Sequence, residues 1–356
     1  MQQLLYRLCI YVNSLIILSF LSACSITIST GFGKSGMHSS AAPMLRSVLP
    51  AVVNVFSEGK NVNCTSFLPN NPALKKQLGL DKNPNEKCLE QSQGSGVIVD
   101  AKKGYIVTNY HNIENAEKTI ITLKDRRQLI AKVVGSDPET DLALLKINAD
   151  HLSELPLTNA DKKLETGDFL VAIGSPFGLD HSVSFGIVSA LGRSGLGLEG
   201  YEDFIQTDAS INVGNSGGAI VAMNGKLVGI SSAIVGANNS NTGIGFAISG
   251  SMAKAVVEQL AKYGEVKRGQ IGIMIDDVML NDKLRAMISS VLPNSPAEKA
   301  GLKTGDIVLA YNGEAIYGSN KLHNALGLAR VGDTVSLKIL RNNKKLTIHV
   351  TLGVRA

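Results

Sequence analysis

The chain has 356 residues, a formal net charge of +5 and 44% hydrophobic residues, which is long enough for two or three domains that each bury a core. Its Lys and Arg residues are spread along the sequence without a dense basic block, and this argues against nucleic acid as a partner because phosphate binding needs clustered cations. Its 36 glycines and many Val and Ile residues favour turn-rich β structure over helical bundles.

The first predicted element is an apolar segment over residues 8–24, preceded by a single charge at Arg7. A short apolar run with a positive flank is typical of an export signal. It ends in Leu21-Ser22-Ala23-Cys24, which resembles the lipobox of bacterial lipoproteins and implies lipidation of Cys24. A cleaved signal peptide and an uncleaved membrane anchor are the alternatives, and all three place the remaining chain outside the cytoplasm.

Two cysteines, Cys64 and Cys88, lie beyond this segment. An even pair in an exported protein is a candidate disulfide, which would constrain the unfolded chain by about 3 kcal/mol on the entropy model. Two unpaired thiols are the alternative. Two cysteines with no nearby His do not make a zinc site, and we expect neither a metal nor a cofactor.

Short apolar segments separated by turn residues follow and predict an all-β sandwich or barrel. Asn224-Gly225 between two of them predicts a two-residue hairpin turn. An amphipathic helix is predicted over residues 251–262, ended by Gly264. The predicted strands are 50–56, 96–99, 105–108, 119–123, 129–134, 142–147, 169–173, 204–207, 219–223 and 226–230.

A second, smaller unit is predicted from Gly269 onward, after a break at residues 263–268 where charges cluster. Its strands are expected at 271–275, 307–311, 334–340 and 346–350. Two short helices are expected at 297–300 and 319–328.

The residues that can do chemistry suggest acyl transfer, which requires a nucleophile, a base, a group that orients the base and donors for the oxyanion. Ser216 is the nucleophile candidate, because the glycines of Gly214-Asn215-Ser216-Gly217-Gly218 allow main-chain N–H groups to point at one spot. The pentapeptide alone fits an ordinary serine equally well. His111 follows a predicted strand and is the candidate base, and Asp141, which leads into an apolar run, is the candidate orienting acid.

The pattern Gly-x-Ser-x-Gly also fits the nucleophile elbow of α/β-hydrolases, in which a helix follows the serine. Here a predicted hairpin follows Ser216, and an esterase triad would have to use residues such as Asp306 and His349. An esterase is therefore the weaker interpretation. A G-x-G-x-x-G match at residues 195–200 lacks the βαβ context of a dinucleotide site.

Several segments together resemble the HtrA/Deg family of trypsin-like serine proteases, from about residue 42 to the C-terminus. The chain order His, Asp, Ser is also that of chymotrypsin-like double barrels. The resemblance implies a mainly β fold, with a chymotrypsin-like double β-barrel protease domain that carries a His111–Asp141–Ser216 triad, followed by a small α+β PDZ domain. The matching segments are residues 108–111, 140–144, 174–178, 206–212, 214–218 and 243–248.

The same resemblance implies that the N–H groups of Gly214 and Ser216, with Asn215 between them, form the oxyanion hole. It also implies a primary substrate pocket that contains no acidic residue and therefore prefers a small aliphatic side chain. The pocket would be lined around Ile230, Ser231 and Ser232.

The second unit resembles a PDZ domain, in which Gln270-Ile271-Gly272-Ile273 would form the carboxylate-binding loop and the next strand would accept a peptide by β-addition. The chain departs from the family pattern at two places. It looks shorter than usual between Asp282 and Ser290, and Asn112 stands where the family usually has an aliphatic residue.

We therefore predict an ATP-independent serine endoprotease of the bacterial cell envelope, which degrades misfolded proteins or cleaves a regulatory substrate under PDZ control. Its partners would be unfolded or C-terminally exposed polypeptides, and it would form a homotrimer in the periplasm, with membrane attachment through the N-terminus as one option. A chaperone or scaffold that binds through the PDZ groove is the alternative. The expected divisions are 1–24 signal or anchor, 25–41 tether, 42–263 protease domain and 266–354 PDZ domain.

Overall fold

The computed structural model describes residues 40–62, 88–176, 181–212, 214–234 and 243–354. The expected signal segment, most of the expected tether, and residues Cys24 and Cys64 lie outside this part of the chain, so the lipidation and disulfide predictions do as well. Among the described residues, no helix has both the length and the apolar character needed to cross a membrane.

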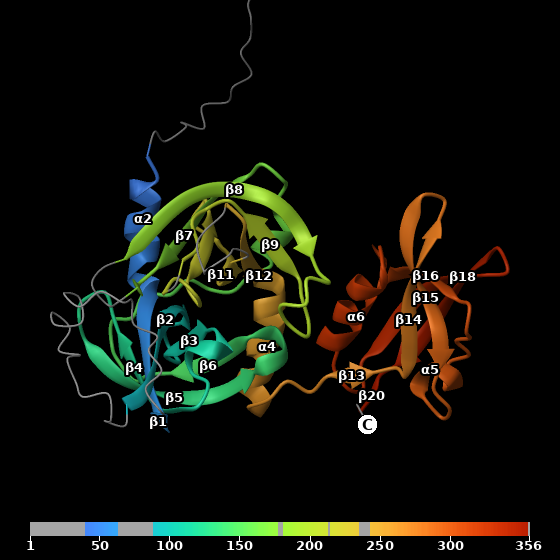
Figure 1. Ribbon diagram of the computed structural model, residues 1–356, viewed down its shortest axis with the longest axis horizontal. Helices are drawn as coiled ribbons and strands as arrows, with labels where there is room; N and C mark the ends of the chain where they lie inside the picture. The colour runs from blue at the N-terminus through green and yellow to red at the C-terminus, as the bar shows by residue number, and fades with distance from the viewer. Residues whose placement is uncertain (1–39, 63–87, 177–180, 213, 235–242, 355–356) are drawn as a thin grey trace, which may run out of the picture. The chain divides into compact units, whose positions relative to one another are not determined.

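Six antiparallel strands form a first closed barrel, in the order β1-β2-β3-β6-β5-β4 (Figure 1). It is preceded by helix α2 (Ala42–Val48). Alternate residues such as Val53, Val55 and Ile121 point into the barrel and are fully buried, as the period of two along a strand requires. The strands are β1 (Val52–Val62), β2 (Cys88–Asp100), β3 (Tyr105–Thr108), β4 (Ala116–Thr122), β5 (Gln128–Asp137) and β6 (Leu142–Lys146).

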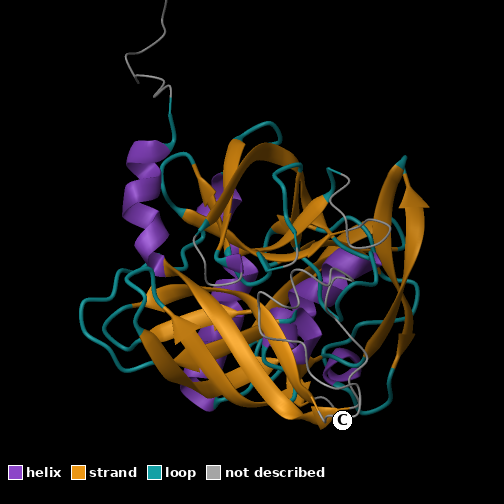
Figure 2. Ribbon diagram, turned by 60° about the vertical axis from the view of Figure 1, so that its left-hand side comes forward, coloured by secondary structure: helices purple, strands orange, loops and turns teal. Residues whose placement is uncertain are grey.

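Six further strands form a second closed barrel, in the order β10-β11-β12-β9-β8-β7. The curved strands of both barrels are visible in Figure 2. The mainly β double-barrel prediction is thus confirmed. The strands are β7 (Phe169–Gly174), β8 (Ser182–Arg193), β9 (Phe204–Thr207), β10 (Ala219–Ala222), β11 (Leu227–Ile234) and β12 (Gly245–Ser249).

Helix α4 (Gly250–Tyr263) packs against strands of both barrels, β5 and β6 of the first and β11 and β12 of the second. The Ser249 hydroxyl accepts the N–H of Met252 at its start, and Gly264, at φ 75°, ends it as predicted. Its buried Val256 and Leu260 belong to a core that also contains residues of both barrels. The helix therefore helps hold the two barrels together.

The C-terminal unit has its own buried core, which includes Ile288, Val308 and Leu337. A short sheet pairs β13 (Gly269–Gln270) with β20 (Gly353–Val354). The larger sheet has the order β14-β15-β16-β18-β19, with β17 paired to β16. Its elements are β14 (Ile273–Leu280), β15 (Lys283–Val291), α5 (Pro296–Lys299), β16 (Ile307–Tyr311), β17 (Glu314–Ala315), α6 (Ser319–Leu328), β18 (Thr334–Arg341) and β19 (Lys344–Thr351).

Two local predictions were wrong in detail. The expected strand 271–275 is interrupted at Gly272, whose φ of 76° leaves the extended region, so β13 and β14 are separate. The hairpin after Ser216 exists, but its turn runs from Ala222 to Gly225, with the N–H of Gly225 donating to the carbonyl of Ala222 (2.8 Å). Gly225 then takes φ 77°, so Met223 and Asn224 are the central residues, where Asn-Gly was expected.

Strand β10 follows Ser216, where an α/β-hydrolase would place a helix. Asp306 pairs with Arg341 (2.6 Å), and His349 lies on β19 opposite Ser336. Neither residue is positioned by the barrel that carries Ser216, so the esterase interpretation is wrong.

The segment between α4 and β13 is fixed by a buried ion pair. Arg268 donates two hydrogen bonds to the carboxylate of Asp137 (2.8 and 2.5 Å), and both side chains are more than nine-tenths buried. The guanidinium also lies 4.5 Å from the ring centre of Tyr201. This segment is therefore anchored to the first barrel.

Replacing Arg268 with Ala is expected to lower the free energy of unfolding by about 3 kcal/mol, because it leaves the buried Asp137 carboxylate without its cation. Urea unfolding measures the change. Arg127→Ala is the matched control, since Arg127 pairs with Asp125 at the exposed surface and its loss is expected to cost below about 1 kcal/mol. Equal effects of the two variants would contradict the prediction.

Candidate active site

His111 and Asp141 meet at two short turns of the first barrel. His111 lies in the 3₁₀ turn Tyr110–Asn112 after β3, and Asp141 follows the 3₁₀ turn Pro138–Thr140 with φ 52°. The His111 Nδ1 lies 2.8 Å from Oδ2 of Asp141, and the His111 main-chain N–H donates to Oδ1 (2.9 Å). Asp141 is only 5% exposed, so one buried carboxylate holds both the ring and the backbone of His111.

The pKa of His111 is set by opposing effects. Burial lowers it, but the hydrogen bond and the negative charge of Asp141 raise it, helped by the charges of Glu199 and Glu114, and the net result is a pKa above the usual value. Because Asp141 accepts at Nδ1, Nε2 remains as the proton acceptor of the neutral ring. These contacts hold the His111 ring in the tautomer whose Nε2 can accept a proton.

Ser216 lies in a tight turn between β9 and β10. Gly217 takes φ 82°, and a Cβ there would come 2.2 Å from the carbonyl oxygen of Ser95. The main-chain carbonyl of Ser216 accepts the N–H of Ser95 (2.8 Å), which ties the turn to the first barrel. In this conformation the Ser216 hydroxyl donates to the carbonyl of Ser232 (3.2 Å), so it must rotate to donate to a base.

The residues predicted for the oxyanion hole adjoin Ser216 and are buried. Gly214 takes φ 93°, and its carbonyl accepts the hydroxyl of Ser95 (2.6 Å). The N–H of Asn215 donates to the carbonyl of Asn212 (2.9 Å), and its amide nitrogen contacts the carbonyl of Ser210 (3.5 Å). These bonds fix the turn that the sequence singles out.

The residues predicted for the substrate pocket lie on β11, directly beside this turn. The N–H of Gly217 donates to the carbonyl of Ser231 (2.8 Å), and Ile230, Ser231 and Ser232 are all buried. The hydroxyl of Ser231 is buried and has no hydrogen-bond partner among the described residues. Ser232 does more than expected, since its hydroxyl contacts Oδ2 of Asp141 (3.4 Å) and so links the pocket strand to the acid.

The loop between β8 and β9, residues 194–203, was not predicted to take part in the site. The Glu202 carboxylate is buried and accepts the main-chain N–H groups of Leu196 and Leu198 (2.6 and 2.7 Å). Burial raises the pKa of Glu199 to about 7; the charges of Asp141 and Glu202 also raise it, and His111 opposes them. Glu199 is therefore close enough to His111 and Asp141 to interact with their charges and ionises near neutral pH.

Replacing Glu199 with Gln is expected to lower the pKa of His111, because the Glu199 charge is one of the groups that raise it. NMR titration of the His111 imidazole measures this. The difference from the wild type should grow as the pH rises through about 7, where Glu199 becomes charged. Glu165→Gln removes a carboxylate that does not act on His111 and serves as control; an unchanged His111 titration in Glu199→Gln would contradict the prediction.

The same loop contacts helix α6 of the C-terminal unit. The N–H of Glu202 donates to Oδ1 of Asn324 (3.2 Å), and the Asn324 amide donates back to the carbonyl of Glu202. The rings of Tyr201 and His323 stack with their centres 4.6 Å apart. Loop 194–203 thus interacts with the charges of His111 and Asp141 and also contacts α6.

The predicted carboxylate-binding loop lies between β13 and β14. Gly272 takes φ 76°, and a Cβ there would meet Ser295 at 2.5 Å. Its carbonyl accepts the N–H of Leu292 (2.9 Å), and the carbonyl of Ile271 accepts that of Ala297 (2.8 Å). Gln270 donates to the carbonyl of Val354 (3.1 Å), and Ile273 begins β14. The loop is therefore firmly held at the end of the strand that would receive a peptide.

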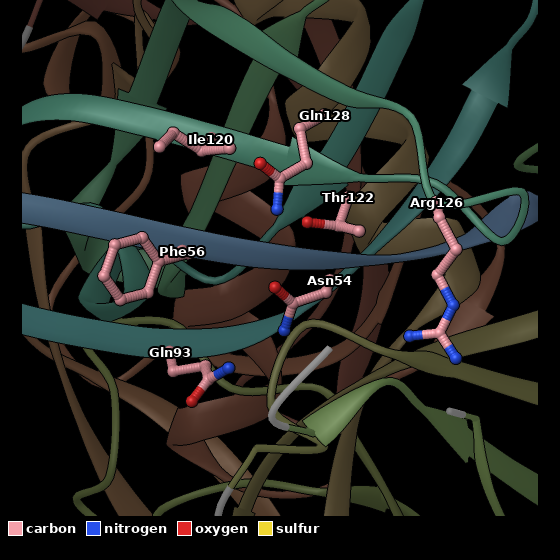
Figure 3. Close-up of a pocket in the computed structure, with 7 residues that line it drawn as sticks. All are labelled: Asn54, Phe56, Gln93, Ile120, Thr122, Arg126 and Gln128. Atoms are coloured by element: carbon pink, nitrogen blue, oxygen red, sulfur yellow. The ribbon is translucent and has the colours of Figure 1, made fainter. Parts of the chain in front are cut away.

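A cavity of about 370 Å³ lies on the outer face of the first barrel (Figure 3). Asn54 and Phe56 alternate along β1 with Val53 and Val55, which point into the barrel, and therefore lie on the opposite side of the strand. Asn54 donates to the carbonyls of Gly94 and Ser175. The cavity contains no residue of the predicted triad, and its lining is Asn54, Phe56, Gln93, Ile120, Thr122, Arg126 and Gln128.

Within the described ranges, His, Cys, Asp and Glu side chains do not form a group of three that could hold a metal ion. The site itself offers a held imidazole, a buried carboxylate and a serine in a glycine turn.

Comparison with known proteins agrees with this arrangement. A trypsin-like peptidase domain matches residues 94–230, and a PDZ domain matches residues 269–352. The chain is 42% identical to the periplasmic serine endoprotease DegP of Salmonella typhimurium, over 94% of this chain and 76% of that protein. It is 46% identical to the periplasmic pH-dependent serine endoprotease DegQ of Escherichia coli, over 88% and 70%.

Solved structures extend the match to three dimensions. The HtrA-type protease AlgW, determined with a decapeptide, is 35% identical and superposes with a TM-score of 0.68, over 89% of this chain and 98% of that one. Sequence identity, domain order and fold point to the same family. The chain belongs to the HtrA/Deg family of serine endoproteases, with a trypsin-like peptidase domain and a PDZ domain.

Proposed function

We propose that this chain is an ATP-independent endoprotease of the bacterial periplasm that cleaves unfolded or C-terminally exposed polypeptides through Ser216, His111 and Asp141. The observation that supports it best is the 2.8 Å contact between Nδ1 of His111 and the buried carboxylate of Asp141, beside the glycine turn of Ser216. Relatives described as periplasmic serine endoproteases support the compartment and favour proteolysis over a purely binding role. The proposed domain limits are 42–263 for the protease and 266–354 for the PDZ domain.

In the proposed mechanism the Ser216 hydroxyl rotates from the carbonyl of Ser232 toward Nε2 of His111 and attacks the scissile carbonyl carbon. His111 takes the proton, and Asp141 stabilises the imidazolium that results. The N–H groups of Gly214 and Ser216 donate to the oxyanion. His111 then returns the proton to the leaving amine, and water hydrolyses the acyl-enzyme by the same path.

Covalent labelling by a fluorophosphonate tests this proposal without a substrate, because the reagent reacts with an activated serine. We expect one label per chain, located at Ser216 by mass spectrometry of the tryptic peptide. Ser210→Ala is the control, since Ser210 lies in the same segment but outside the proposed triad. Labelling at another residue, or none in folded protein, would overturn the assignment and leave a binding protein as the better description.

We propose further that the PDZ domain controls proteolysis by binding polypeptide C-termini at residues 270–273. Support comes from the contacts of loop 194–203, which interacts with Asn324 and His323 of α6 on one side and with the charges of His111 and Asp141 on the other. A peptide with a free C-terminus is expected to change the turnover of a peptide substrate, and its amidated form is not. Identical responses to the two peptides would contradict carboxylate recognition.

A homotrimer is the proposed assembly, and an exposed aromatic pair on the second barrel supports self-association. Phe169 and Phe185 are each 55% exposed, and their ring centres lie 5.2 Å apart. Such a pair leaves adjacent apolar surface in water unless another copy covers it. Sedimentation of the wild type against Phe169→Ser/Phe185→Ser tests this, and a monomeric wild type would refute it.

Attachment to a membrane is proposed through lipidation of Cys24, on the lipobox-like sequence that ends there. Incorporation of labelled fatty acid into the wild type but not into Cys24→Ser is the expected result.

A disulfide between Cys64 and Cys88 is proposed because an exported protein with an even pair of cysteines usually joins them. Counting the free thiols of the unfolded, unreduced protein tests it.

A further inference from the structure

Asn112 has no role in the proposed mechanism, although its side chain contacts Ser216. It follows His111 directly, is 2% exposed, and fills the space in front of Gly94. Its amide nitrogen donates to the hydroxyl oxygen of Thr108 (3.0 Å) and to the main-chain carbonyl of Ser216 (3.0 Å). The residue after the base therefore holds the peptide group of the nucleophile.

The Ser216 carbonyl has a second donor in the N–H of Ser95 (2.8 Å), and the Thr108 hydroxyl donates to the carbonyl of Ser95 (2.7 Å). The four residues Asn112, Thr108, Ser95 and Ser216 thus form a closed ring of hydrogen bonds. This ring joins the end of β3, strand β2 and the catalytic turn of the other barrel. An aliphatic side chain at position 112 has no donor, and would leave Ser95 as the remaining described donor to that carbonyl.

We propose that Asn112 is a positioning residue, which fixes the Ser216–Gly217 peptide relative to His111 and thereby the position of the Ser216 Cα, from which the hydroxyl projects. The inference rests on the proposed role of Ser216 and deepens it. Two bonds to one carbonyl oxygen restrict rotation of the peptide plane more than one bond does. The Ser216 Cα also carries the N–H that is a proposed oxyanion donor, so a shift of this atom moves both the attacking hydroxyl and the donor, and misplacement by about 1 Å can cost about 100-fold in rate.

The test compares Asn112→Val with Asn112→Thr, which have the same branched shape and differ in one hydroxyl donor. Asn112→Val is expected to lower kcat for a peptide substrate by about 10- to 100-fold with KM within about twofold, and to slow fluorophosphonate labelling by the same factor. Asn112→Thr is expected to recover part of the lost kcat and part of the lost labelling rate. A rate loss confined to KM, or equal kcat values in the two variants, would overturn the proposal.

A matched control distinguishes the positioning role of Asn112 from a contribution to stability alone. Thr119→Val removes another buried hydrogen bond of the first barrel, the 3.2 Å contact of Thr119 with Ser57, away from the catalytic turn. It is expected to cost similar stability in urea unfolding while kcat stays within about twofold of the wild type. A kcat loss in Thr119→Val equal to that of Asn112→Val would mean that stability alone explains the effect.

Should Asn112→Val not fold, Asn112→Asp carries the same test, because it keeps the size of the side chain and replaces its donor by an acceptor. Slower labelling then supports the proposal, and labelling at the wild-type rate overturns it. Failure of the proposed function has a different signature, since a chain without an activated Ser216 would not be labelled even as wild type.

Discussion

Replacing Ser216 with Ala is expected to lower kcat for peptide-bond cleavage by about 10⁶-fold, the order of loss when a Ser–His–Asp hydrolase loses its nucleophile. The reason is that Ser216 carries the one hydroxyl of the turn 214–218, and the neighbouring hydroxyl of Ser232 contacts the Asp141 carboxylate instead. The turn should persist, because its bonds involve main-chain atoms of Ser216. A reduced, alkylated protein is a suitable substrate, and product is followed on denaturing gels.

Controls separate chemistry from folding in this comparison. The variant should retain the wild-type unfolding midpoint, since a half-buried hydroxyl is all that it loses. Peptide binding to the PDZ domain should also be unchanged. A variant that still cleaves within tenfold of the wild type would exclude Ser216 as the nucleophile.

Replacing Asp141 with Asn is expected to lower kcat by about 10⁴-fold with little change in stability. Asp141 stands at φ 52°, a left-handed conformation that Asn adopts readily, so the turn should survive. The amide, however, can donate to Nδ1, and the ring would then carry its proton on Nε2, where it cannot act as a base. Because Nδ1 of His111 lies 2.8 Å from Oδ2 of Asp141, an amide at this position would act on the tautomer of the ring directly.

The pH dependence of Asp141→Asn provides an independent check. The hydrogen bond and charge of Asp141 raise the pKa of His111, so their loss is expected to shift the acid limb of the residual activity to lower pH. Steady-state rates measured from pH 5 to 9 test the direction. A shift to higher pH, or a loss of kcat below about tenfold, would contradict the assigned role.

The strands with strong apolar runs were predictable from the sequence. Tyr105–Thr108 and Ile307–Tyr311 match the expected ranges because each is a short, largely apolar run bounded by turn residues. Strand β8 (Ser182–Arg193) could not be predicted because only Gly186 and Val188 are buried in it and glycines interrupt any alternation. Strand β15 (Lys283–Val291) begins with charged residues, which hide its strand pattern in the region where the chain looks shorter than the family pattern.

The candidate site shows the same limit. Chain order and flanking residues were enough to single out His111, Asp141 and Ser216. The contact of Ser232 with Asp141 joins β11 to the turn before β6, and nothing in either local sequence signals a partner about 90 residues away in the other barrel. Glu199 was also missed, since its raised pKa comes from burial and from charges that only the fold brings near.

Gly94 carries a consequence for how this sequence can change over generations. A Cβ at position 94 would lie 2.4 Å from both the amide nitrogen and the oxygen of Asn112, although nothing in the backbone angle of Gly94 itself demands glycine. The two positions therefore constrain one another. A side chain at position 94 requires Asn112 either to leave its hydrogen bonds or to be replaced, so the two sites are expected to covary.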